Sequence, residues 1–401
     1  MKPLEGIRVL DLSRVLAGPW ATQTLADLGA EVIKVEQPGA GDDTRHWGPP
    51  WHEHGEEKVA AYFLAANRGK RSVAIDLSKA EGAALVRRMA ASADVLVENF
   101  KVGGLKKFGL DADSLRAANP RLIYASITGF GQDGPYASRA GYDYMIQGMG
   151  GLMSLTGLPD GEPGGGPMKV GVAFADLFTG MYTANAIVAS LYRREKSGEG
   201  ATIDVALLDT QLAMLANQAS NALVSGNDPK RLGAGHPNIV PYQPFQAADQ
   251  PIIIAVGNDP QFAKLAAILG HPEWAADPAY ATNAARVAAR SELVPMIGEV
   301  IARRSSAEWL ALLEEAGIPA GPINTISQAL ADPQALHRGA RISAGGGALG
   351  EVPMVGSPMR LDGERMDAPL PPPALGEHGD LLGEWVDADE LARLRSAGIV
   401  A

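Results

Sequence analysis

Short apolar runs and amphipathic segments alternate along the first 130 residues of the chain. The apolar runs are rich in β-branched residues and predict strands at 7–12, 31–35, 72–77, 94–97 and 122–127. The amphipathic segments predict helices at 21–28, with Pro19 at a first helical position, at 79–92 and at 111–118. Residues 37–60 are polar and rich in Pro and Gly, so we expect a loop there. This rhythm predicts a mostly parallel, doubly wound sheet of the Rossmann-like α/β class.

The pattern changes in the second half of the chain. A Gly- and Pro-rich loop at 156–168 precedes a predicted helix at 179–194, a strand at 201–207 and a long helix at 210–224. Irregular sequence, a strand and a run of helices follow at 226–247, 252–256 and 260–317, and helices at 324–331 and 389–397 bracket a proline-rich stretch. We therefore expect a large domain in two parts, 1–224 and 323–401, with a smaller α+β domain at 225–322 between them.

Length and the N-terminal sequence bound the class of protein. A chain of 401 residues exceeds one ordinary core, which agrees with two domains. No apolar run reaches the roughly 18 residues that a membrane helix needs. The start, Lys2-Pro3-Leu4-Glu5, has the composition of a folded domain and not of a signal peptide. We expect a cytoplasmic protein with no membrane partner.

Composition also excludes several kinds of chemistry. The absence of Cys excludes disulfides and thiol nucleophiles. A net charge of −11 argues against nucleic acid as a partner. The seven His residues show no spacing typical of metal ligands, so we predict no metal site.

In a doubly wound sheet, ligands bind beyond the carboxyl ends of the strands. Those ends carry Ser13-Arg14-Val15, Glu36, Glu98-Asn99-Phe100 and Thr128-Gly129-Phe130. Neither the dinucleotide fingerprint nor the Walker A loop is present. The sequence thus predicts a nucleotide-binding type of fold without the usual nucleotide loops.

Asp176 is a carboxylate in an unusual setting. It lies in Val172-Ala173-Phe174-Ala175-Asp176-Leu177, where small and apolar residues surround it and the nearest cation in sequence is Lys169. Burial raises the free energy of its charged form, and the free N–H groups of the helix that follows could act as donors. Cys is absent and no Gly-x-Ser-x-Gly elbow is present, whereas a carboxylate can act as a covalent nucleophile. A plain helix N-cap is the alternative.

Two segments of the large domain have a composition suited to ligand binding. The segment 67–72 holds Arg68, Lys70 and Arg71, which suit a phosphate group or, alternatively, a solvated surface loop. The segment 128–135 has three glycines, which allow a ligand close to the backbone or make a tight connection.

Two further candidates are less specific. Tyr142, at a predicted junction of loop and helix, could donate to a substrate carboxylate or be an ordinary half-buried Tyr. Gly233, Gly235 and His236 lie in a glycine-rich segment that is either a mobile loop closing over a site or a linker.

The joint order of these motifs carries more information than any one of them. The segments concerned are 3–11, 17–19, 28–36, 67–72, 94–100, 129–135, 175–180, 317–322 and 375–378. On these segments the chain resembles the family III CoA transferases, which include formyl-CoA transferase, carnitine CoA transferase and 2-methylacyl-CoA racemase. The resemblance covers nearly the full length.

The resemblance implies a function for Asp176 and an assembly for the chain. Asp176 would attack an acyl-CoA thioester to form a mixed anhydride, CoA would re-attack to give an enzyme thioester, and an acceptor acid would then take over. Acyl-CoA would be a substrate, with no tightly bound cofactor. Because such transfer conserves the energy of the thioester, no ATP loop is needed. The family fold also implies an interlocked homodimer.

The resemblance also implies where CoA binds. The nucleotide end of CoA would lie near Arg68, Lys70, Arg71, Asn99 and Lys107, and Val15 and Leu16 would line its thiol end. Two departures, Leu16 in place of Gln and Gln37 in place of Arg, argue against the oxalate and formyl-CoA pair. Tyr142 stands where racemases carry His, and a phenol is a poor base at neutral pH.

The sequence therefore predicts an acyl-CoA:carboxylate CoA transferase with Asp176 as the nucleophile. We expect succinyl-CoA as the donor and a small dicarboxylate as the acceptor. The alternatives are a 2-methylacyl-CoA racemase or epimerase, and a catalytically silent CoA-binding protein.

Overall fold

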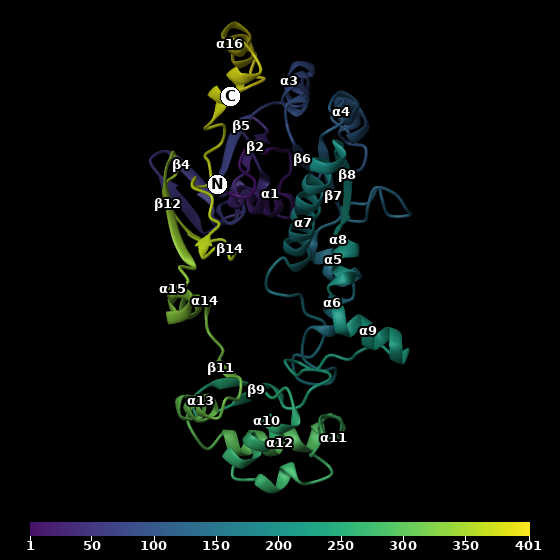
Figure 1. Cartoon of the computed structure of the whole chain (residues 1–401), viewed down its shortest axis with the longest axis vertical. Coiled ribbons are helices and arrows are strands. Elements are labelled where there is room, and N and C mark those ends of the chain that lie inside the picture. Colours follow the sequence, from purple (N-terminus) through teal and green to yellow (C-terminus); the bar gives the residue numbers. More distant parts are fainter. The chain divides into compact units, whose positions relative to one another are not determined.

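The computed structural model describes residues 1–401, which form two compact units (Figure 1). Unit 1 comprises residues 1–152, 170–220 and 333–401, and unit 2 comprises residues 153–169 and 221–332. The loop at 153–169 thus belongs to unit 2, although it precedes a long stretch of unit 1 in the sequence.

Unit 1 is built on a parallel sheet of six strands. The strands are β1 (Arg8–Asp11), β2 (Glu31–Glu36), β5 (Lys70–Ala74), β6 (Val95–Glu98), β7 (Ile123–Thr128) and β8 (Ala201–Ala206). Their order is β5-β2-β1-β6-β7-β8, and every neighbouring pair is parallel. The predicted parallel α/β fold is confirmed. The order of the strands reverses between β1 and β6, so a crevice is expected beyond their carboxyl ends.

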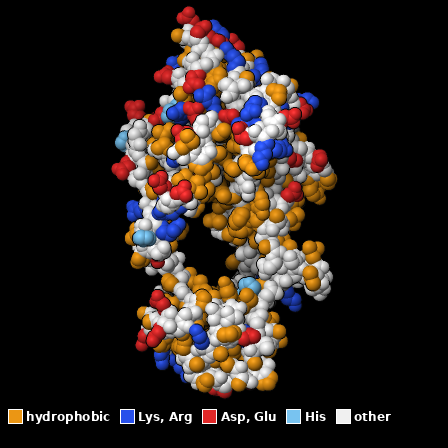
Figure 2. Space-filling model, viewed as in Figure 1, with side chains coloured by type: hydrophobic (Ala, Val, Ile, Leu, Met, Phe, Trp, Pro, Cys, Tyr) orange, Lys and Arg blue, Asp and Glu red, His pale blue; other side chains and the backbone are white.

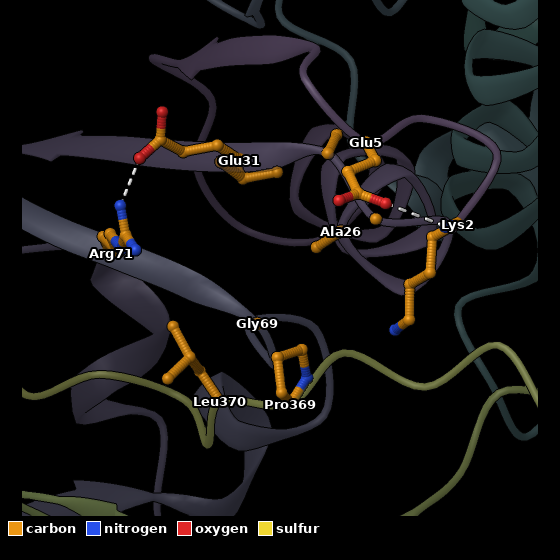
Figure 3. A pocket seen from close by; sticks show the side chains of 11 residues that line it. Lys2, Glu5, Ala26, Glu31, Gly69, Arg71, Pro369 and Leu370 are labelled. Atoms are coloured by element: carbon orange, nitrogen blue, oxygen red, sulfur yellow. Dashed lines mark hydrogen bonds and ion pairs between the residues drawn. The ribbon is translucent and has the colours of Figure 1, made fainter.

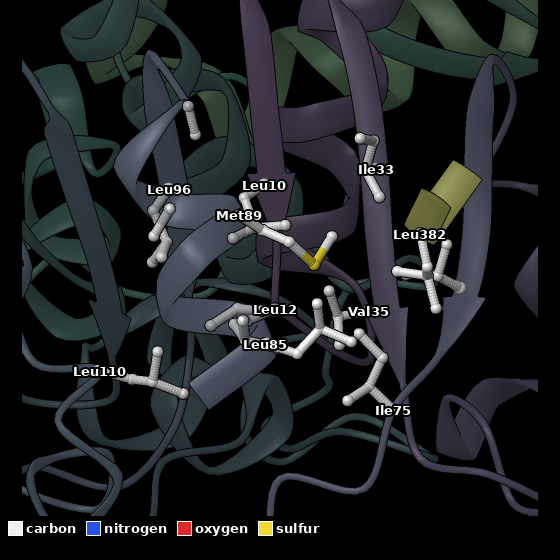
Figure 4. Packing of buried hydrophobic residues seen from close by; sticks show 14 of the residues in the cluster. Leu10, Leu12, Ile33, Val35, Ile75, Leu85, Met89, Leu96, Leu110 and Leu382 are labelled. Carbon is white, nitrogen blue, oxygen red and sulfur yellow. The ribbon is translucent and has the colours of Figure 1, made fainter. Parts of the chain in front are cut away.

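Both faces of the sheet are buried because successive residues of a strand point to opposite sides. On one face the core joins the strands to α3 (Ala80–Ala91) and the C-terminal segment, and it includes Leu10, Leu12, Ile33, Leu85, Met89 and Leu382 (Figure 4). On the other face the core joins the strands to α1 (Ala17–Asp27) and α7 (Phe174–Ser197), and it includes Val9, Val32, Val95, Leu25 and Ile187. Neighbouring residues of β1 therefore belong to different cores: Leu10 to the first and Val9 to the second.

The other elements of unit 1 are shorter. Its further helices are α2 (Ala61–Leu64), α4 (Ala112–Ala118), α5 (Asp143–Met149), α8 (Leu207–Ala213), α15 (Pro333–His337) and α16 (Ala388–Ser396), with 3-10 turns at η1 (Asp43–His46), η2 (Lys106–Phe108) and η4 (Gly379–Glu384). Three antiparallel hairpins pair β3 (Trp51–His54) with β4 (Glu57–Ala60), β12 (Arg341–Gly347) with β13 (Gly350–Val355), and β14 (Arg360–Leu361) with β15 (Glu364–Arg365). The chain passes between the units within α6 (Leu152–Leu155) and α9 (Ala216–Ser225), and again after residues 169 and 332.

Three predictions of local structure are wrong. The expected loop at 37–60 contains the β3–β4 hairpin, whose strands pair only with each other. The helix expected from residue 179 begins at Phe174, so Asp176 lies within it. The long helix expected at 210–224 is divided into α8 and α9, because Ala216 adopts a left-handed φ of +47° that interrupts a helix.

Unit 2 has its own core. A three-stranded antiparallel sheet contains β9 (Tyr242–Gln246), β10 (Pro251–Ala255) and β11 (Ala320–Pro322). Its helices are α10 (Asp259–Ile268), α11 (Asn283–Ala288), α12 (Arg290–Ile301), α13 (Ser306–Glu315) and α14 (Ile326–Ala331), with a 3-10 turn at η3 (Pro272–Ala275). Trp309 is the largest fully buried side chain of this core, and its indole N–H donates to Ile301 O at 2.7 Å. In the whole chain, no helix has the length and apolar character required to cross a bilayer.

Candidate active site

Asp176 is the third residue of α7, and its half-buried carboxylate accepts no hydrogen bond. Two expectations about it are corrected. It does not cap the helix, because the N-cap position is Ala173. It also does not receive the free N–H groups of the first turn, because the carboxylate of Asp143 takes them. Asp143 Oδ1 accepts from the N–H of Ala175 at 2.8 Å and from that of Asp176 at 3.4 Å.

Asp143, which the sequence did not single out, is held in place on α5. Gln147 donates to Asp143 Oδ2 at 2.7 Å and accepts from the N–H of Val170 at 2.9 Å, so the Gln147 amide ties α5 to the segment before α7. The start of α5 lies against the end of β7 because two glycines pack backbone to backbone there. A Cβ added to Gly129 would lie 2.5 Å from Gly141 Cα. Gly129 therefore permits a tight connection within the chain, which was the alternative to close approach of a ligand.

The electrostatic consequence is a weakly acidic Asp176. Burial and the neighbouring Asp143 charge raise the pKa of Asp176 to about 7. Half of such carboxyls are charged near neutral pH, and the charged form has no donor to stabilise it within the chain. A desolvated, basic carboxylate of this kind is a better nucleophile than an ordinary surface Asp.

The packing of α7 against α1 decides what lies beside Asp176. A Cβ added to Gly180 would lie 2.6 Å from Ala17 O, so only glycine permits this contact. Leu28 near the end of α1 and Val188 further along α7 line one pocket, so the two helices run in the same direction. Asp176 precedes Gly180 by four residues on the same helix face. It therefore lies one helical turn before the contact with Ala17, towards the end of α1 at which the turn with Val15 and Leu16 enters.

Tyr62 belongs to the same region, although no pattern in the sequence pointed to it. The side chain is half-buried on α2, and its ring meets that of Trp47 edge to face, with centroids 5.3 Å apart. Burial, then the charges of Asp176, Asp143 and Asp42, raise the pKa of Tyr62. The phenol therefore stays protonated and offers an O–H donor in the electric field of these three carboxylates.

The turn after β1 is joined to the end of β6 across the point where the strand order reverses. Asn99 Oδ1 accepts from the N–H of Arg14 at 2.9 Å, and Asn99 Nδ2 donates to Arg14 O at 2.7 Å. The structure thus brings together three of the predicted residues, Val15, Leu16 and Asn99, at the carboxyl edge of the sheet.

The basic segment 67–72 is placed differently from the prediction. Lys70 is fully buried, and its three ammonium protons reach Asp11 Oδ2 at 3.0 Å, Pro19 O at 3.0 Å and Asn67 Oδ1 at 2.9 Å. Arg68 is also buried and forms a bidentate pair with Asp27 at 2.9 and 2.6 Å. Lys70 has no donor left for a phosphate, and the Arg68 guanidinium is buried against Asp27 and Val355 O, so neither side chain belongs to a solvated loop.

Arg71 is partly exposed, but it lies near the start of β5, at the amino edge of the sheet. There it pairs with Glu31 beside Lys2 and Leu370 in a pocket (Figure 3). Parallel strands place their amino ends at the edge opposite to Val15 and Asn99. Arg68 and Lys70 thus belong to a buried ion-pair network, and Arg71 lies at the edge of the sheet opposite to the expected crevice.

Two exposed cations follow strands at the carboxyl edge. Lys107 in η2 lies over the ring of Phe108 at 4.7 Å. Arg139, which the sequence reasoning missed, lies over the rings of Tyr136 at 4.5 Å and Phe130 at 5.3 Å. Neither forms an ion pair within the chain, so both have free donors. Only the tertiary stacking of Arg139 distinguishes it from other surface arginines.

The remaining predicted residues occupy separate places. Tyr142 is 65% exposed at the N-cap of α5, directly before Asp143. Gly233, Gly235 and His236 belong to unit 2, where the N–H of Gly233 donates to Gly157 O at 3.2 Å. Burial and the charge of Arg290 lower the pKa of His236, whose Nδ1 accepts from the N–H of Asn238 at 3.1 Å. No group of three or more His, Asp or Glu is arranged to hold a metal ion.

Comparison with known proteins identifies the family of the chain. The family model described as "CoA-transferase family III" matches residues 4–379. The chain belongs to this family. It is 54% identical to the succinate–glutarate CoA-transferase of Agrobacterium fabrum over 378 residues, which cover 94% of each chain. It is 43% identical to the human succinyl-CoA:glutarate CoA-transferase, over 100% of this chain and 90% of that protein.

A solved structure supports the fold independently. The crystal structure of a CAIB/BAIF family protein from Brucella suis superposes with a TM-score of 0.84 at 52% identity. The match covers 97% of this chain and 99% of that one. The predicted activity class is confirmed, and this protein is a CoA transferase that moves CoA between an acyl-CoA and a carboxylate.

The raised pKa of Asp176 predicts a pH dependence of the first half-reaction. Because the nucleophile must be deprotonated, kcat/KM for the CoA ester should rise with pH through a single ionisation near 7 and then level off. Asp143→Asn removes a neighbouring negative charge, so the midpoint should move to lower pH. Asp133→Asn, on the exposed loop after β7, is the control and should leave it in place. An unmoved midpoint in Asp143→Asn would contradict the electrostatic account.

Asp176 should also make the protein less stable as the pH rises. Its folded pKa of about 7 lies above the unfolded value, so the native state binds the proton more tightly and stability falls as pH rises between about 4 and 7. Asp176→Asn removes this effect. The variant should melt at the wild-type temperature near pH 4 and roughly 2–4 °C or more above it at pH 8. A constant difference across this pH range, measured by calorimetry, would disprove the assignment.

Proposed function

We propose that this CoA transferase moves CoA from succinyl-CoA to glutarate and that Asp176 carries the acyl group. The observation that supports the role of Asp176 is its carboxylate, which is half-buried, free of hydrogen bonds and one helical turn before Gly180, where α7 packs on the first turn of α1. The choice of substrates rests on relatives named for succinate or succinyl-CoA and glutarate, at 54% and 43% identity.

The proposed first half-reaction transfers CoA to the enzyme. An Asp176 carboxylate oxygen attacks the thioester carbon of succinyl-CoA, and the C–S bond breaks to release CoA thiolate and leave a succinyl-aspartyl anhydride. The thiolate then attacks the Asp176 side-chain carbonyl carbon. Its C–O bond to the succinyl group breaks, which releases succinate and leaves Asp176 as a thioester of CoA.

The second half-reaction runs the same steps in reverse with the acceptor. A glutarate oxygen attacks the Asp176 thioester carbon and expels CoA thiolate, which gives a glutaryl-aspartyl anhydride. The thiolate attacks the glutaryl carbonyl, which yields glutaryl-CoA and a free Asp176 carboxylate. One glutarate oxygen is thereby left on Asp176 in each turnover.

Features of the chain suit these steps. The N–H groups of Ala17 and Gly18, in the first turn of α1, have no partner in the chain and could stabilise a tetrahedral oxyanion near Asp176. The carboxylate of Asp143 accepts from neutral donors, the helix N–H groups and the Gln147 amide, and forms no ion pair. Its negative charge therefore keeps Asp176 basic. The O–H of Tyr62 offers a donor for a substrate carboxylate. The apolar turn at Val15 and Leu16 keeps water from an anhydride.

For CoA, we propose a path along the carboxyl edge of the sheet. Val15 and Leu16 line the thiol end, Asn99 supports the turn, and Lys107 and Arg139 take the nucleotide phosphates. Arg68, Lys70 and Arg71 are left out because the first two are internally satisfied and the third faces the other edge. Tyr142 and the unit 2 residues Gly233, Gly235 and His236 stay predictions as substrate residues.

We also propose the interlocked homodimer that the family resemblance implied. An exposed apolar strip on α7 supports a protein partner: Phe178, Met181, Tyr182 and Val188 are 37–48% exposed, and hydrophobic side chains gather on this part of unit 1 (Figure 2). The domain bounds 1–224, 225–322 and 323–401, the α+β character of the smaller domain and the cytoplasmic location stay predictions.

The transfer itself can be tested with oxygen labelling. Wild type in excess over succinyl-CoA, so that each site turns over at most once, is incubated with glutarate labelled with oxygen-18 in both carboxylates. It should form glutaryl-CoA, and the peptide that contains Asp176 should gain one heavy oxygen, whereas repeated turnover with excess succinyl-CoA should add a second. Asp176→Asn should lose roughly a thousandfold or more in turnover, because an amide is a poor nucleophile. Asp133→Asn is the control. Transfer without label on that peptide would contradict the anhydride route.

The same preparation separates transferase from racemase. A 2-methylacyl-CoA incubated with the enzyme in deuterated water should take up no deuterium, because Tyr142 is no base for the second face of the 2-carbon. Steady deuterium uptake without transfer to any acid would favour the racemase.

The two phosphate candidates can be tested by truncation. Lys107→Ala and Arg139→Ala should each raise KM for the CoA ester about tenfold or more, because a charge-assisted hydrogen bond is worth roughly 1.5–3 kcal/mol. KM for glutarate should stay unchanged. Lys196→Ala is a matched control, because Lys196 stacks on Tyr192 at 4.3 Å much as Lys107 stacks on Phe108. Equal effects on both substrates would mean that these cations do not contact CoA.

A further inference from the structure

Val15 has a strained backbone at a functional position. Its φ is +71°, which is in the left-handed region, although a β-branched side chain disfavours that conformation. Apart from Val15 and the glycines, only Ala216 and Asp362 have a positive φ in this chain, and neither of them is β-branched. Such a conformation persists only when the surroundings enforce it.

The carboxylate of Asp42 is the group that enforces it. The N–H of Val15 donates to Asp42 Oδ1 at 3.2 Å and to Oδ2 at 3.3 Å. Asp42 is fixed in turn by Thr44, whose N–H and hydroxyl donate to Oδ1 at 3.0 and 2.8 Å. The side chain of Asp42 is fully buried, so its position does not depend on solvent.

Lys34 keeps this carboxylate charged and ties it to the same turn. Its ammonium group lies 2.9 Å from Asp42 Oδ2 and donates to Ser13 O at 2.8 Å. Burial alone would raise the pKa of Asp42, but the Lys34 charge and the bonds from Thr44 outweigh it and lower the pKa. Lys34 is itself completely buried on β2, between Ile33 and Val35, where an apolar residue would be less costly.

We propose that Asp42 and Lys34 are positioning residues of the transfer reaction. They hold Val15 in its left-handed conformation and so fix the turn 13–16 at the place where the thiol end of CoA meets Asp176. A turn released from Asp42 would let Val15 relax to negative φ and would move the backbone before α1 away from the reacting atoms. This inference rests on the proposed function, because Val15 and Leu16 are assigned to the thiol end there.

The test compares Asp42→Asn with Asp27→Asn. Asp27 is an equally buried carboxylate paired with Arg68, and it does not contact the turn. Both variants should lose similar thermal stability. Asp42→Asn should lower kcat by roughly 30- to 100-fold with less than threefold change in either KM, because displacement by about 1 Å has effects of this size. Asp27→Asn should keep kcat within about threefold.

A second variant keeps the inference testable if Asp42→Asn folds poorly. Glycine adopts positive φ without strain, so in a Val15→Gly background the further loss from Asp42→Asn should shrink to about fivefold. Hydrogen exchange of the peptide covering residues 13–20 should accelerate in Asp42→Asn and not in Asp27→Asn, a measurement that needs no substrate. These results together would support a positioning role.

The outcomes separate the inference from the proposed function. If wild type transfers CoA but Asp42→Asn and Asp27→Asn lose kcat equally, or if exchange of the turn is unchanged, the inference is wrong and the function stands. If the loss from Asp42→Asn is as large in the Val15→Gly background, the inference is also wrong. If wild type transfers no CoA to any acid, the proposed function fails, and the catalytic role of the pair fails with it.

Discussion

Two buried lysine–aspartate pairs beneath the turn between β1 and α1 are the constraint on which the rest of unit 1 depends. Lys70 pairs with Asp11 at 3.0 Å and Lys34 with Asp42 at 2.9 Å, and all four side chains are fully buried. Burial alone would raise the pKa of Asp11, but the charges of Lys70 and Lys34 outweigh burial and lower this pKa to about 2. Buried charges are tolerated only when all their donors and acceptors are satisfied, so this network permits one arrangement of the turn.

The turn between β1 and α1 then determines the chemistry available at the edge of the sheet. Asp11 also accepts from the N–H of Ser13 at 2.9 Å, and Asn99 holds both sides of Arg14, so little freedom is left before α1. Because α7 packs against α1 through Gly180, the position of the turn also determines what Asp176 faces. A rigid backbone on one side and a basic carboxylate on the other are suited to a reaction that passes through reactive acyl intermediates.

The state of Asp176 depends on a second carboxylate used in an ordinary structural way. Asp143 caps α7 from a neighbouring helix, which consumes the donors that would otherwise stabilise a negative charge on Asp176. The same Asp143 charge then raises the pKa of Asp176 together with burial. The contact of Asp143 with the start of α7 thus has two effects. It stabilises the end of the helix, and it destabilises the charged form of Asp176 beside it.

The sequence by itself determined the parallel α/β fold and the family and gave Asp176 as the predicted nucleophile, because these depend on local periodicity and on residues that follow one another in the chain. It also placed Val15 and Asn99 at one edge of the sheet, because the carboxyl ends of parallel strands must share an edge, whereas Leu16 was implied by the family resemblance. Only the tertiary structure decided that Lys70 and Arg68 are internal and that Arg71 lies at the opposite edge. Exposed and buried cations look alike in a sequence, since their partners Asp11 and Asp27 are about 40 to 60 residues away. Asp143 and Tyr62 were missed for the same reason: their surroundings come from contacts between distant segments, which no local pattern records. Arg139 was missed because its contacts with Phe130 and Tyr136 depend on the shape of one loop, which the residue pattern does not show.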